Sequence, residues 1–213
     1  MALARLDPEV SRLKFESEVG RLAEQRVALE ARGIFLLGTP TFPIVELMFV
    51  PRTPLKVAFQ PPQTGTIVLP PGSIALAVAE VPSLAARAFK AHFELTDYDL
   101  RAPSLEFKDP WTDEPLSFNT MFRAVEYEKE RKAHTVLLDN HPLTHKPFLC
   151  IRGIREYHEH PQHSGDDWLL YRGQMGVFSA VMSLWRVAID LVGPILMTQP
   201  SGLQVNWNAE AKE

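Results

Sequence analysis

The sequence has one cysteine, Cys150, and no long uninterrupted run of apolar residues. A single cysteine excludes an internal disulfide framework and a four-cysteine zinc site. The most apolar stretch, residues 177–197, contains serine, arginine, aspartate and proline, so it indicates a buried helix rather than a membrane span. The N-terminal residues contain no apolar run of the length that a secretory signal needs. We therefore expect a cytoplasmic protein with no membrane partner.

Basic clusters are also missing, and glycine is scarcer than proline. The 22 lysines and arginines are interspersed with 26 aspartates and glutamates, which gives a formal net charge of −4 and argues against a nucleic-acid partner. The 18 prolines against 11 glycines demand many rigid turns, and this excludes an all-helical bundle. A chain of 213 residues suits a single large domain, which we place at residues 1–200 with a loose tail at 201–213.

The N-terminal part has the signals of one amphipathic helix over about residues 8–32. Asp7 is a suitable N-cap, Pro8 suits the first helical position, and Gly33 suits a left-handed C-terminal position. Apolar residues recur between them at helical spacing: Phe15, Val19, Leu22 and Leu29. We expect this apolar face to pack on a sheet.

After this helix the period changes to that of strands. Short β-rich runs occur at 34–37, 44–50, 55–59, 66–69, 74–78 and 93–95, with prolines at their borders. They predict a four-stranded antiparallel meander whose helix-facing side includes Leu55, Val57, Phe59, Phe93 and Leu95. The more polar residues 108–140 suggest an inserted arm. A last helix is expected at about 168–192, capped by Ser164 or Asp166, and the whole predicts an α+β fold.

Residues 141–163 hold five of the seven histidines and the only cysteine. One interpretation is a zinc site, because thiolate, imidazole and carboxylate are the ligands that zinc prefers. The candidate ligands are Cys150, Glu156, His158 and His163, with His160 in reserve.

The second interpretation is thiol chemistry at Cys150. Arg152 and Arg155 follow the cysteine, while His141 and His145 precede it. Cationic neighbours lower the pKa of a thiol and enlarge its thiolate fraction, so we expect fast alkylation. The alternative is an inert cysteine that packs as a small apolar side chain.

Two resemblances to known families rest on particular residues. The run from Cys150 to Trp168, CIRGIREYHEHPQHSGDDW, resembles the bacterial family of predicted metal-binding CEHH domains, which occur in operons with ubiquitin-like proteins and ThiF-type activating enzymes. The order of elements resembles the ubiquitin-conjugating enzyme fold. Residues 98–107 are similar to the proline-rich run of that family, and His141-Pro142 stands before Cys150 as its His-Pro-Asn motif stands before the catalytic cysteine.

These resemblances imply a fold, a function and partners. The fold would be an N-terminal helix, a four-stranded meander, an active-site loop and a C-terminal helix. Cys150 would carry a ubiquitin-like protein as a thioester, received from a ThiF-type activating enzyme, with His141 and Asn140 as further catalytic residues. Asn140 would stand in for the asparagine of the motif, because Leu143 occupies its third position. No cofactor is needed for this transferase. The alternative is a non-catalytic adaptor in the same pathway, which binds zinc through Cys150, Glu156 and two histidines.

Overall fold

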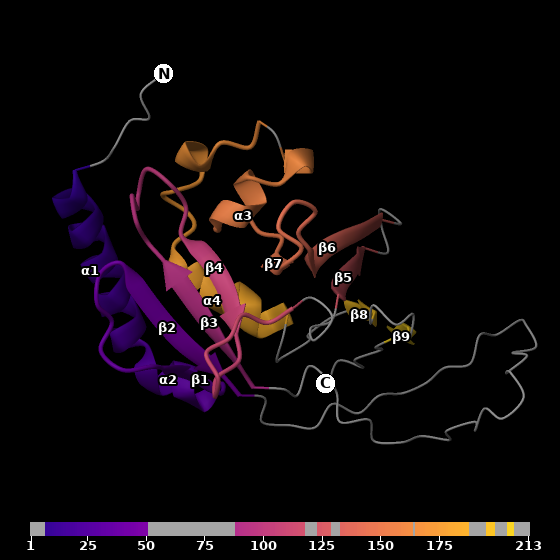
Figure 1. Ribbon diagram of the computed structural model, residues 1–213, viewed down its shortest axis with the longest axis horizontal. Helices are drawn as coiled ribbons and strands as arrows, with labels where there is room; N and C mark the ends of the chain where they lie inside the picture. Colours follow the sequence, from indigo (N-terminus) through magenta and orange to yellow (C-terminus); the bar gives the residue numbers. More distant parts are fainter. Residues whose placement is uncertain are drawn as a thin grey trace, which may run out of the picture.

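The computed structural model describes residues 7–50, 88–117, 123–128, 133–163, 165–187, 195–198 and 204–206 (Figure 1). The strands expected at 55–59, 66–69 and 74–78 lie outside these residues, as do Ser164 and most of the expected tail. Among the described helices, none combines the length and the apolar composition that crossing a bilayer requires.

The N-terminal helix is confirmed, with one interruption. It is divided into α1 (Pro8–Glu24) and α2 (Arg26–Ala31) at Gln25. The carboxylate of Asp7 caps α1 by accepting a hydrogen bond from the Glu9 N–H at 2.9 Å. Gly33 follows α2 with a φ of 80°, the left-handed conformation that favours glycine.

A four-stranded antiparallel sheet follows, in the order β1-β2-β3-β4. The strands are β1 (Ile34–Leu36), β2 (Ile44–Phe49), β3 (Phe89–Glu94) and β4 (Ser104–Lys108). The predicted α+β class and the four-stranded meander are therefore confirmed. However, the third and fourth strands come from residues 89–108, and the 104–108 strand had not been expected from the sequence pattern.

The main core lies between this sheet and the helices. Phe15, Leu22 and Leu29 are buried on the helices, and Val19 packs against the same cluster. Alternate residues of β2 are buried, as period two requires for one face of a sheet. In the view of Figure 1, α1 lies at one side of the sheet and α4 (Val177–Trp185) crosses it. The buried α4 residues belong to the same core cluster as the sheet residues.

A second sheet has five strands in the order β7-β6-β5-β8-β9. They are β5 (Arg123–Glu128), β6 (Ala133–Asn140), β7 (Pro147–Leu149), β8 (Ile195–Thr198) and β9 (Gln204–Asn206), and all neighbours pair antiparallel. The prediction of a surface arm at 108–140 needs correction, because its second half supplies two inner strands of this sheet. Residues 204–206 of the expected loose tail are likewise paired in β9.

The last helix starts later than predicted. Residues 168–170 form only a 3₁₀ turn, η4 (Trp168–Leu170), which is capped by Asp167 rather than by Asp166. The α-helix begins at Val177, whose N–H donates to the Glu18 carboxylate of α1 at 3.1 Å. Tyr98 donates to the same carboxylate at 2.9 Å, so the cap of α4 comes from residues distant in sequence.

Candidate functional site

Cys150 lies directly after β7, at the edge of the second sheet. Its backbone N–H donates to the Leu137 carbonyl of β6 at 2.9 Å, which fixes the position of the residue. The side chain is half-buried and its Sγ lies 3.4 Å from His163 Nε2. Both residues line a groove of about 860 Å³, together with Asn140, Phe148, Tyr157 and His160. The structure thus brings the cysteine together with one of the five histidines of the segment in a hydrogen-bonded pair.

The ionisation of this pair differs from our expectation. Burial raises the pKa of Cys150 to about 11, and the nearby charge of Asp139 acts in the same direction. The prediction of a lowered pKa was therefore wrong. Burial also lowers the pKa of His163 from its usual value. At neutral pH the pair is thus a thiol beside a neutral imidazole, an arrangement in which Sγ–H donates to Nε2.

Aromatic rings surround His163. Tyr157, from α3 (Arg155–His158), stacks on the imidazole with a centroid distance of 3.9 Å and an interplanar angle of 16°. His160 lies 5.1 Å from His163 and 5.2 Å from Phe148, measured between ring centroids. Burial lowers the pKa of His160, and the neighbouring His163 and His141 lower it further.

His141, predicted as a catalytic residue, is engaged by the backbone at both ring nitrogens. Nδ1 accepts from the N–H groups of Leu143 and Thr144 at 3.3 and 3.4 Å, and Nε2 lies 3.2 Å from the Glu156 carbonyl oxygen. The ring is buried. These contacts brace the loop before β7, so His141 supports the site through the backbone.

Asn140, the second predicted partner of Cys150, is the last residue of β6 and lines the same groove. Its Oδ1 is buried and has no hydrogen-bond partner among the described residues. The acceptor atom of this side chain is therefore unpaired within the part of the chain that the structure describes.

The predicted zinc ligands are used in other ways. The Glu156 carboxylate accepts hydrogen bonds from the Ser104 hydroxyl and, at 3.1 Å, from the Leu105 N–H of β4. His158 has Nδ1 at 2.7 Å from the Asp166 carbonyl oxygen and Nε2 at 2.7 Å from the Arg152 carbonyl oxygen. In the parts of the chain that the structure describes, no group of three or more histidine, cysteine, aspartate and glutamate side chains is placed to hold a metal ion. The zinc site stays a prediction.

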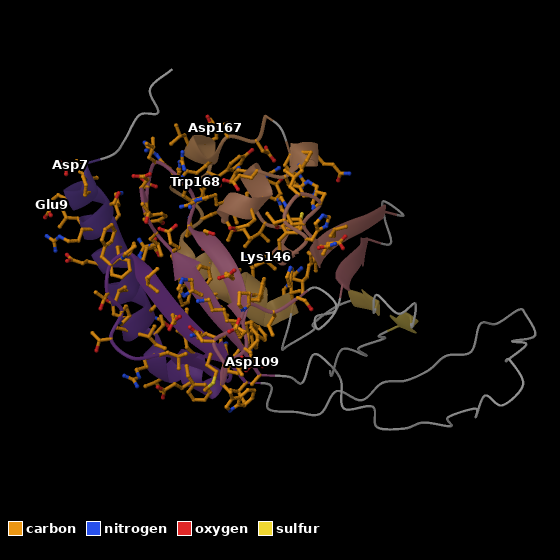
Figure 2. The ribbon with its side chains drawn as sticks, viewed as in Figure 1. Asp7, Glu9, Asp109, Lys146, Asp167 and Trp168 are labelled. Atoms are coloured by element: carbon orange, nitrogen blue, oxygen red, sulfur yellow. The ribbon has the colours of Figure 1, made fainter. Side chains whose placement is uncertain are left out.

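Two residues of the site were missed by sequence reasoning. The sequence pattern assigns no role to Tyr157, and it offers Asp166 only as a helix cap. The Asp166 carboxylate instead accepts from the hydroxyls of Tyr157 and Tyr171 at 2.7 and 3.1 Å. Figure 2 shows the neighbouring Asp167 and Trp168 above the sheet, where the short helical turns of this segment gather. No sequence signal distinguishes Tyr157 from an ordinary core tyrosine.

Comparison with known proteins points to the same segment. Residues 129–191 match the Y4jH-like family model. This span contains Cys150, His163 and the loop between them. The chain is also 29% identical over 189 residues to the uncharacterized protein y4jH of Sinorhizobium fredii. The aligned region covers 80% of this chain and 77% of that protein. The similarity to y4jH therefore extends well beyond the cysteine segment, into the four-stranded sheet.

Proposed function

We propose that the protein carries a ubiquitin-like protein as a thioester on Cys150, in a bacterial conjugation pathway with a ThiF-type activating enzyme. The observation that carries this proposal is the 3.4 Å contact between Cys150 Sγ and His163 Nε2 at the wall of a groove. The α+β architecture, with an N-terminal helix packed on a four-stranded meander, is compatible with a core like that of ubiquitin-conjugating enzymes.

The contact suits a thiol that loses its proton as it attacks. Because the pKa of Cys150 is raised to about 11, little thiolate exists at neutral pH and a base is needed during the reaction. His163 Nε2 takes the proton while Sγ bonds to the carbonyl carbon of the thioester on the activating enzyme. The carbon–sulfur bond to that enzyme then breaks, and the leaving thiolate takes the proton from His163. The products are a thioester on Cys150 and a free thiol on the activating enzyme.

Asn140 is the residue to which we assign stabilisation of the oxyanion in this step. It is the last residue of β6 and lines the groove with Cys150. An amide N–H directed at the developing negative charge would lower the barrier. Its removal is expected to slow thioester formation by about 100-fold or more.

The experiment is a charging assay with the full chain, a ubiquitin-like protein, a ThiF-type activating enzyme and ATP. We expect an adduct on non-reducing gels that dithiothreitol removes and that Cys150→Ala abolishes. His163→Ala is expected to slow charging by about 100-fold, the usual scale of a lost general base. His145→Ala is the matched control, because His145 is an exposed histidine of the preceding loop.

Metal content of the purified protein distinguishes the zinc adaptor. The proposal would be overturned in favour of the adaptor by two results together. The native protein would hold about one equivalent of zinc that Cys150→Ser loses, and the charging assay would give no adduct.

A further inference from the structure

We infer that Tyr157 is a positioning residue that fixes the His163 imidazole against the Cys150 sulfur. The inference rests on the proposed function in one respect, namely that His163 takes the proton of Cys150. It adds a residue that neither the cysteine motif nor the similarity to known proteins assigns.

The first argument is the geometry of the stack. The Tyr157 and His163 rings lie nearly parallel, with centroids 3.9 Å apart. His163 is the last residue of the short 3₁₀ turn η3 (Pro161–His163), which has no buried residue of its own. A ring stacked on one face of the imidazole fixes the plane in which Nε2 points, and Nε2 is the atom that contacts Sγ. The orientation of the base thus depends on a side chain from α3.

The second argument is that Tyr157 is itself held in place. Its hydroxyl donates to Asp166 at 2.7 Å, and the ring is only 7% exposed. The same carboxylate accepts from Tyr171 and, at 3.2 Å, from the Arg152 Nε. These three donors come from three separate segments, so the carboxylate is fixed from several directions. An ordered acceptor for the hydroxyl restricts rotation of the tyrosine ring, and the stack transmits this order to His163.

The third argument is that the loop carrying His163 is tied back to the same residues. The Asp166 N–H donates to the His163 carbonyl at 3.1 Å. His158, adjacent to Tyr157, contacts the carbonyl oxygens of Asp166 and Arg152. Because these bonds anchor the loop, a movement of the Tyr157 ring would tilt the ring plane of the His163 imidazole without moving its backbone. The contact between His163 Nε2 and Cys150 Sγ would then be lost.

The test measures alkylation of the full-length protein by iodoacetamide at pH 8, followed by intact mass. Cys150 is the only cysteine, so each added carbamidomethyl group reports this one thiol. We expect His163→Ala to slow labelling about tenfold or more, because the proton acceptor is gone. Tyr157→Leu is expected to slow labelling to within about twofold of His163→Ala. Tyr157→Phe keeps the stacked ring but loses the hydroxyl bond to Asp166, so it is expected to slow labelling only severalfold.

A double variant shows whether Tyr157 acts through His163. Tyr157→Leu combined with His163→Ala is expected to label no more slowly than His163→Ala alone, since both changes remove the same effect. Phe15→Leu is the control for a lost buried aromatic ring in the distant part of the core, and it is expected to leave the labelling rate unchanged. If Tyr157→Leu does not fold, Asp166→Ala loosens the tyrosine with its ring intact and is expected to slow labelling severalfold.

The outcomes separate the two claims. The positioning role is overturned, and the proposed function is kept, if His163→Ala labels slowly while folded Tyr157→Leu labels at the native rate. Where Tyr157→Leu does not fold, native labelling in Asp166→Ala has the same meaning. Native labelling in His163→Ala overturns both, because His163 then takes no proton. Faster labelling in Tyr157→Leu than in the native protein assigns the tyrosine a merely shielding role and also overturns the inference.

Discussion

The reactivity of Cys150 depends on where its neighbours point rather than on how near they stand in sequence. Arg155 donates to Glu94 and to the carbonyl oxygens of Ala102 and Thr96, and Arg152 pairs with Asp166. Both guanidinium groups thus form ion pairs with carboxylates rather than with the Cys150 sulfur. Burial then dominates and raises the pKa of the thiol, which is the physical reason why the expectation of a reactive thiolate was wrong.

Cys150 is therefore expected to react more slowly with iodoacetamide than a small free thiol at pH 7. In His163→Ala, where no imidazole takes the proton, the labelling rate should rise about tenfold per pH unit and level off only near the pKa of about 11, because the thiolate is then the reacting form. Intact mass measured against time, from pH 7 upward, gives the profile. A rate that levels off below pH 8 would contradict the raised pKa.

Glu156 is the second residue whose protonation is set by its surroundings. Burial raises its pKa above the usual 4.5, although the bonds from Ser104 and Leu105 act in the opposite direction. A carboxyl group with a raised pKa in the folded protein contributes stability below its ordinary pKa and loses it as the pH rises. We expect Glu156→Gln to be at least as stable as the native protein at pH 7, and its advantage should shrink as the pH falls toward 4.5.

Glu156→Ala is the companion variant. It leaves the Ser104 hydroxyl and the Leu105 N–H without their acceptor, so it is expected to cost about 1–3 kcal/mol of unfolding free energy. Urea unfolding at pH 5 and pH 7 checks both variants. A Gln variant that is clearly less stable than the native protein at pH 7 would show that Glu156 is stabilised as a carboxylate.

At the scale of elements, the parts that the sequence could predict are those whose signals are local. Asp7, Pro8 and Gly33 mark the ends of the N-terminal helix because caps act over a few residues. The start of α4 could not be predicted, since Glu18 provides its cap from α1. The inner strands β5 and β6 were missed because their polar sequence does not alternate in the way that a half-buried strand does.

The same distinction applies to the site. The density of histidines identified the segment around Cys150, but could not select His163 over the others. That choice depends on α3 and η3, which turn the chain so that His163 faces the sulfur while His158 contacts backbone carbonyls. Residues 155–158 form the helix α3, and this helix sets the directions of these side chains.

Leu22 tests the packing of α1 on the core. Its side chain is completely buried, so Leu22→Ala is expected to lower the unfolding free energy by about 2–5 kcal/mol. Leu13→Ala is the matched control on the same helix, because Leu13 is 55% exposed, and its effect should stay within about 0.5 kcal/mol. Chemical denaturation compares the two, and equal effects would mean that this face of α1 is not the packed one.

At the scale of the whole molecule, α3 and the residues beside it connect the four-stranded sheet to the site. Lys146, just before β7, pairs with Glu106 of β4 at 2.6 Å, and Figure 2 shows Lys146 between the two sheets. The Arg155 N–H donates to the Pro103 carbonyl at 2.9 Å, at the approach to β4. The residues that hold His163 therefore depend on the four-stranded sheet as well as on their own loop.

Arg155 is the side chain that tests this connection. Its guanidinium reaches three acceptors at once: the Glu94 carboxylate at 3.0 Å and the carbonyl oxygens of Ala102 and Thr96 at 3.2 Å. A lysine keeps the positive charge but lacks the planar fork that serves several acceptors. We expect Arg155→Ala to cost about 2 kcal/mol of unfolding free energy, and Arg155→Lys to recover less than half of this loss.

The control is Arg12→Ala, which removes an exposed arginine that pairs with Glu9 and Glu16 on α1 and is expected to have little effect on stability. Urea unfolding gives the stabilities, and amide hydrogen exchange of residues 155–163 gives the local consequence. Because α3 begins at Arg155, faster exchange in Arg155→Ala should extend from α3 into η3 while α1 keeps its protection. Full recovery of stability by lysine would mean that charge alone matters at this position, and that the three-acceptor geometry does not join α3 to the sheet.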